Sequence, residues 1–166
     1  MGRLPLVMHK NMNTQNLISI INTDELTYEA TSLMAWEMGV VDNIDDVAQF
    51  MWQGGPFPPQ ASAKRPRRIK LSEDDPRPKK KYWDFVKNEM FYFLCENNPK
   101  YKELWSRIGR LENKSTSAIV LVISGYIGEK SGVEGSILAG FVAVCLYGAA
   151  KISKEALCEY LKVNNA

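Results

Sequence analysis

Histidine is nearly absent from this sequence, in which His9 is the only one. His9 also lies in a terminal segment that we expect to be mobile, so we predict no catalytic triad or dyad built on histidine and no typical zinc site. No GxSxG nucleophile motif occurs, and the glycines between 125 and 135 lack the spacing of a dinucleotide-binding loop. We therefore predict a non-enzymatic protein with no catalytic residue, metal ligand or cofactor. A small enzyme with an unrecognised site is the third interpretation.

A phosphate-binding loop is also missing, although residues 124–131 approach its pattern. Such a loop needs glycine directly before its Lys-Ser pair, so that backbone N–H groups can surround the phosphates. Here Glu129 stands directly before Lys130 and Ser131, where its charge would repel a triphosphate. The segment therefore favours a turn between two helices.

Cysteine is scarce and odd in number, with Cys95, Cys145 and Cys158. No CxxC pair occurs, and each cysteine stands in an apolar helical context. From the first residues we expect neither a secretory leader nor myristoylation. These features are typical of buried, reduced thiols, and we expect an intracellular, cytoplasmic protein.

Positive charge is almost missing from the first 63 residues, which carry two basic and seven acidic side chains. Residues 64–81 reverse this balance with nine basic and three acidic side chains, and the remainder carries ten and nine. The overall net charge of +2 therefore hides a strongly uneven distribution. Only the middle block could attract a polyanion.

The middle block combines cations with neighbouring aromatic residues. Cations neutralise phosphates, and an aromatic ring can stack on an unpaired base. The same composition is compatible with a nuclear-import signal, a tether to an acidic protein or membrane surface, or a solvated linker without a partner. Nucleic acid is the leading functional interpretation, whereas Trp83 is expected in the core because it aligns with Val86 and Met90. The candidate contact residues are Lys64, Arg65, Arg67, Arg68, Lys70, Arg77, Lys79, Lys80, Lys81 and Tyr82.

Apolar runs of about twenty residues, the length that spans a membrane, do not occur. The two longest apolar segments, residues 118–128 and 137–150, are separated by a charged turn. Small residues recur three or four positions apart in both, so we expect a close-packed helical hairpin with Gly140 in its interface. Burial in the protein core is favoured over lipid contact, and a membrane-associated helical hairpin protein is the runner-up interpretation.

Helical spacing and capping signals recur along the chain and predict an all-α fold. Residues 1–59 form an N-terminal helical region, in which helices over 24–38 and 42–53 pair as a hairpin and Gly39 stops the first. Residues 60–81 form an exposed basic linker containing proline, and residues 82–166 form a C-terminal helical bundle. This organisation predicts a non-catalytic interaction protein, an adaptor or accessory subunit, whose basic arm contacts nucleic acid or an acidic partner. A protein partner is also expected.

Overall fold

The fold is all-α, as the sequence predicts. The computed structural model describes residues 12–53, 79–96 and 98–165, and these residues contain helices and turns but no strand. The elements are α2 (Thr14–Ile20), α3 (Thr23–Glu29), η1 (Thr31–Leu33), α4 (Met34–Glu37), α5 (Ile44–Gln53), α7 (Lys80–Met90), η2 (Phe91–Cys95), η3 (Pro99–Tyr101), α8 (Lys102–Gly109), α9 (Thr116–Ser131), α10 (Gly135–Lys151) and α11 (Lys154–Asn165).

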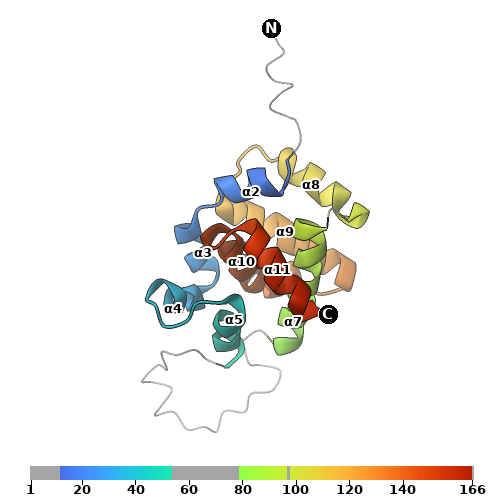
Figure 1. The fold of residues 1–166 in the computed structure, drawn as a ribbon. Coiled ribbons are helices and arrows are strands. Elements are labelled where there is room, and N and C mark those ends of the chain that lie inside the picture. Colours follow the sequence, from blue (N-terminus) through green and yellow to red (C-terminus); the bar gives the residue numbers. More distant parts are fainter. Residues whose placement is uncertain (1–11, 54–78, 97, 166) are drawn as a thin grey trace.

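Helix α10 is the centre of the molecule, with α2, α3, α5, α7, α9 and α11 packed around it (Figure 1). It is apolar on all sides, which is the pattern of a helix enclosed by protein. Phe141 of α10 contacts the rings of Trp52 in α5 and Trp83 in α7, at centroid distances of 6.5 and 5.3 Å. Helices from both sides of residues 54–78 therefore share one hydrophobic core.

Among the residues that the structure describes, no helix combines the length and the apolar character needed to cross a membrane. The two apolar segments fall in α9 and α10. Eleven residues of α10, between Leu138 and Ala149, are buried within the fold. The burial predicted for these segments is thus observed.

The N-terminal hairpin differs from its prediction, because the expected helix over 24–38 is broken at Ala30. Ala30 has an extended backbone (φ −143°, ψ 92°), and the chain continues as η1 and α4. Leu26 and Ala35 are both fully buried, yet nine positions apart they would point to opposite sides of an unbroken helix. The break allows both to enter the core. The stop at Gly39 is confirmed, with φ of +79°.

Close approach of α9 and α10 occurs at the turn between them. A Cβ atom on Gly128 would lie 2.3 Å from the carbonyl oxygen of Val133, and one on Gly135 would lie 2.8 Å from the Cα of Gly125. Gly140 was expected in this interface but faces elsewhere. A Cβ atom there would meet Met51 of α5 at 2.7 Å and the Glu29 carbonyl of α3 at 3.3 Å. Because helices pack around α10 on all sides, the side of α10 that carries Gly140 contacts the N-terminal helices α3 and α5.

The expectation of three reduced thiols is wrong for two of them. Cys95, at the end of η2, and Cys158, in α11, form a disulfide with a Cα–Cα distance of 5.8 Å. They are separated by 63 positions, and no local pattern marks them as partners. Cys145 is the buried, free thiol that was expected, and burial raises its pKa well above the usual range.

Candidate functional site

The basic block is the site that the sequence proposes, and the structure describes its last part. Six of its candidate residues lie outside the described residues: Lys64, Arg65, Arg67, Arg68, Lys70 and Arg77. Lys79 is the N-cap of α7, and Lys80, Lys81 and Tyr82 form the first turn of that helix. The helix thus includes the last two residues of the expected linker, Lys80 and Lys81.

The first turn of α7 places positive charge where a helix is already positive. Lys79, Lys80 and Lys81 are all exposed, the turn contains no acidic residue, and the Lys79 side chain makes no capping hydrogen bond. Cations are unfavourable at a helix N-terminus because they face the positive end of the macrodipole. The Lys80 ammonium pairs with Asp84 at 3.1 Å, but both side chains are more than half exposed, so this pair contributes little stability.

Two aromatic rings accompany these lysines. The Lys80 ammonium lies 5.8 Å from the ring centre of Trp52, and the Lys81 ammonium lies 5.3 Å from that of Tyr82. Both rings are partly exposed and partly packed on the core. Trp83 is 1% exposed and belongs to the core, as predicted. Sequence reasoning missed Trp52, because nothing local indicates that α5 ends beside the start of α7.

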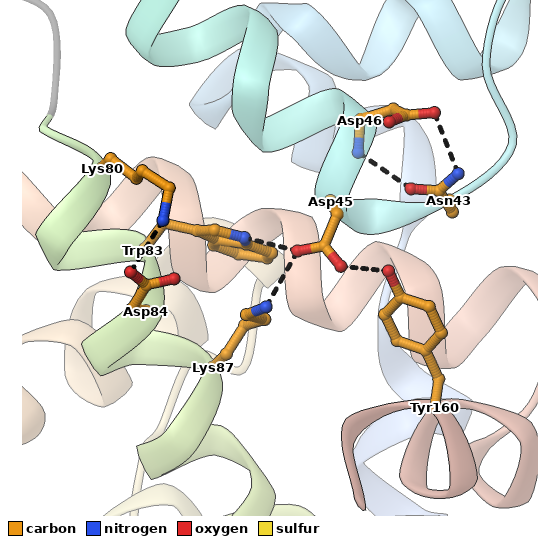
Figure 2. Close-up of polar contacts among 8 residues, drawn as sticks. All are labelled: Asn43, Asp45, Asp46, Lys80, Trp83, Asp84, Lys87 and Tyr160. Carbon is orange, nitrogen blue, oxygen red and sulfur yellow. Dashed lines mark hydrogen bonds and ion pairs between the residues drawn. The ribbon is translucent and has the colours of Figure 1, made fainter. Parts of the chain in front are cut away.

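Asp45 fixes the helix that carries the lysines (Figure 2). Its carboxylate accepts hydrogen bonds from the Trp83 indole N–H at 2.7 Å and from the Lys87 ammonium at 2.9 Å, both on α7. It also accepts from the hydroxyl of Tyr160 on α11. Asp45 therefore joins α5, α7 and α11. No local signal in the sequence reveals these three partners.

The protonation of Asp45 follows from these contacts. Burial acts to raise the pKa of the carboxyl group, but the hydrogen bonds from Tyr160, Lys87 and Trp83 together hold the pKa below its usual value. Burial and the neighbouring Asp45 raise the pKa of the Tyr160 hydroxyl, which keeps its proton. In Figure 2, Lys80 and Asp84 lie on the side of Trp83 away from Asp45. The network is thus a structural anchor, and the lysines project from a helix that it orients.

A second anchored carboxylate lies further along α7. Glu89 is 8% exposed, and it accepts hydrogen bonds from the Tyr101 hydroxyl and from the Lys100 ammonium, the latter at 2.9 Å. It stands just before the π-helical turn η2, a kind of irregularity often found near functional sites. Its partners are side chains of the fold itself, so these contacts join α7 to η3.

A broad open cleft provides a second positive surface, at the start of α2, beside η2 and α8 and next to the start of α11. Of the residues that the structure describes, the cations Lys102, Arg110, Lys114 and Lys154 line it, together with one carboxylate, Glu112. The Lys114 ammonium donates to two backbone carbonyls at the end of α8, and Arg110 donates to Ser106. Two of the four cations are therefore already committed to local structure.

Metal coordination and relatives supply no further indication of function. Within residues 12–53, 79–96 and 98–165, no three His, Cys, Asp or Glu side chains are grouped so that they could hold a metal ion. No family model matches the chain, and no curated protein or solved structure is significantly similar to it. Functional inference therefore depends on the site itself.

Proposed function

We propose that this protein is a non-catalytic interaction or accessory protein whose basic arm, residues 64–81, contacts nucleic acid or an acidic partner. The observation that supports this is the first turn of α7, where three exposed lysines face the positive end of an uncapped helix. A bound anion would gain both from the lysines and from the positive end of the helix macrodipole. Charges arranged against local stability are typical of functional sites.

Nucleic acid is the favoured partner because the lysines continue a longer run of cations. Nine basic residues within residues 64–81 provide positive charge along a chain, which suits a linear polyanion better than one small anion. Trp52 and Tyr82 lie beside the lysines and offer partly exposed rings on which unpaired bases could stack. Single-stranded nucleic acid is therefore expected to bind more tightly than a duplex.

Binding to labelled single-stranded DNA, duplex DNA and a poly-glutamate peptide tests this proposal in the full-length protein. We expect the triple variant Lys79→Gln, Lys80→Gln and Lys81→Gln to weaken single-strand binding. It should also reduce the slope of log affinity against log salt concentration by roughly 2, because three phosphate contacts are lost. Adding Lys64→Gln, Arg65→Gln, Arg67→Gln and Arg68→Gln should abolish binding. Stronger binding of poly-glutamate than of either DNA would identify an acidic protein as the partner.

Two further triple variants make the test specific. Lys130→Gln, Lys151→Gln and Lys162→Gln remove the same charge from exposed positions outside both positive surfaces, and this control should bind like the unmodified protein. Lys102→Gln, Arg110→Gln and Lys154→Gln instead remove charge from the cleft. Loss of binding in the cleft variant alone would contradict the proposed arm and assign the polyanion to the cleft.

The cytoplasmic location stays a prediction, and the disulfide offers a direct test of it. Disulfides persist mainly in oxidising compartments, whereas the cytoplasm keeps thiols reduced. Alkylation of thiols in intact cells, followed by mass spectrometry of Cys95 and Cys158, measures their oxidation state in place. Complete oxidation would argue against a cytoplasmic location.

A further inference from the structure

Exposed apolar side chains gather in the N-terminal part of the fold. Among the described residues, eight large apolar side chains are well exposed, and five of these lie between residues 20 and 40. Met34, Met38 and Val40 fall within seven positions and are 48%, 61% and 51% exposed. These three residues form what we call the methionine face.

The local backbone holds the methionine face outward. Met34 begins α4 and Met38 is its C-cap, one helical turn later, so their side chains lie on the same side. The helix ends in a Schellman motif, in which the Gly39 N–H donates to the Trp36 carbonyl and the Val40 N–H donates to the Ala35 carbonyl. That turn brings Val40 back beside the helix end.

The other side of α4 is fixed to the core. Ala35 is fully buried, and the Trp36 ring meets the ring of Tyr147 edge-on at 5.3 Å. The position of α4 is therefore determined by these contacts, and the methionine face remains exposed without contributing to them. Large apolar groups gathered on a surface indicate an interaction site more often than scattered ones do.

The charge around this face is negative. Residues 12–53 carry seven carboxylates and no lysine, arginine or histidine. Glu37, in α4 itself, accepts a hydrogen bond from the Tyr147 hydroxyl at 2.6 Å. After burial and Glu37, the negative charge of Asp24 also contributes to raising the pKa of Tyr147. Asp42 is exposed two positions after Val40. Among the described residues, the Lys151 ammonium lies near this group, 5.7 Å from the centre of the Tyr147 ring.

We propose that the methionine face binds a basic, amphipathic helical segment of a partner protein. Methionine side chains are flexible and polarizable, so they adapt to the apolar side of a bound helix. The surrounding carboxylates favour lysine and arginine on the same segment and disfavour acidic segments. This surface has the opposite charge to the basic arm, so the protein would join a basic partner to a polyanion.

Binding of a labelled model peptide to the full-length protein tests this assignment. The peptide has about 18 residues, with leucine on one helical face and lysine on the other. Two control peptides have the same composition in scrambled order, or glutamate in place of lysine. We expect the amphipathic basic peptide to bind at least roughly tenfold more tightly than either control. Equal binding of the scrambled peptide would overturn the proposal, because it would show attraction by charge alone.

Substitutions then locate the peptide. Met34→Gln with Met38→Gln keeps chain length and helix propensity but removes the apolar contact, and it should weaken binding roughly tenfold. Leu121→Gln with Ile137→Gln changes two apolar residues that are similarly exposed on α9 and α10, and it should leave affinity unchanged. Glu37→Gln with Asp42→Asn should weaken binding and reduce its salt dependence. Equal loss in the methionine and control variants would overturn the proposal.

Two further measurements distinguish a lost contact with the peptide from a loss of stability and from dimer formation. If the methionine variant unfolds at a lower temperature than the unmodified protein, Val40→Thr, outside α4, replaces it as the test. Sedimentation velocity measures the mass of the free protein across concentrations. A dimer that the methionine variant converts to a monomer would show that a second copy covers the face, and this would overturn the assignment to a basic partner.

Discussion

The indole N–H of Trp83 donates a hydrogen bond to the Asp45 carboxylate at 2.7 Å, across 38 positions of sequence. This contact satisfies the polar atom of an otherwise buried ring and gives the partly buried carboxylate one of its three donors. Neither residue could be enclosed without cost in the absence of the other. The start of α7, and with it the proposed polyanion contact, depends on this pairing.

Removal of the Asp45 carboxylate should therefore destabilise the protein. We expect Asp45→Ala to lower the free energy of unfolding by about 2–4 kcal/mol, because it leaves the largely enclosed Lys87 ammonium without its partner and deprives Trp83 of its acceptor. Asp46→Ala is the matched control on the same helix, and it should lower the free energy of unfolding by less, because within the described residues Asp46 forms hydrogen bonds with its neighbour Asn43 alone. Urea denaturation measures both, and equal losses would contradict the anchoring role.

Asp45 also predicts how stability depends on pH. Its pKa in the folded protein lies below the usual value for aspartate, so the folded state favours the ionised form. The resulting stabilisation is present above the unfolded-state pKa of about 3.9, and it is lost as pH falls through the lower folded-state pKa. When the pH is lowered from about 5 to about 2, the free energy of unfolding should therefore fall less in Asp45→Asn than in the unmodified protein. If the free energies of unfolding of the two proteins fell by the same amount over that range, the assignment to Asp45 would be wrong.

The disulfide should make stability depend on redox state. The disulfide links positions 63 residues apart and so restricts the unfolded chain. Its reduction should therefore lower the free energy of unfolding by up to about 4 kcal/mol. Urea denaturation with and without dithiothreitol measures this loss. The double variant Cys95→Ala and Cys158→Ala is the control, in which dithiothreitol should have no effect. No change in the unmodified protein would show that the bond contributes little to stability.

Local patterns predicted the helices of this fold better than the contacts between them. The spacing of Trp83, Val86 and Met90 indicated a buried face, which is observed, and the left-handed stop at Gly39 is likewise found. Both depend on chemistry within a few residues of sequence. The break at Ala30 could not be predicted in this way, because it results from the need to bury Leu26 and Ala35 together.

The residues of the candidate site likewise divide into those that the local sequence reveals and those that only tertiary contacts bring together. Lys79, Lys80 and Lys81 stand out in the sequence because consecutive charges are a local feature. Trp52 and Asp45 do not, because their roles arise only when α5 packs beside α7. The disulfide is a further case, since Cys95 and Cys158 become neighbours only after α11 packs against η2. Tertiary contacts of this kind leave no periodic signal in a single sequence.

Two glycines of α9 should respond in opposite ways to alanine. Gly125 has no atom within 4 Å of a new Cβ, so Gly125→Ala should raise the free energy of unfolding by about 0.5–1 kcal/mol through better helix propensity. A Cβ atom on Gly128 would lie 2.3 Å from the Val133 carbonyl oxygen and 3.1 Å from the Gly135 nitrogen, both backbone atoms. Gly128→Ala must therefore displace the turn that precedes α10, and it should lower the free energy of unfolding by about 1–3 kcal/mol. Thermal and urea unfolding of the two variants measure this contrast, and a neutral Gly128→Ala would show that the turn can open without loss of packing.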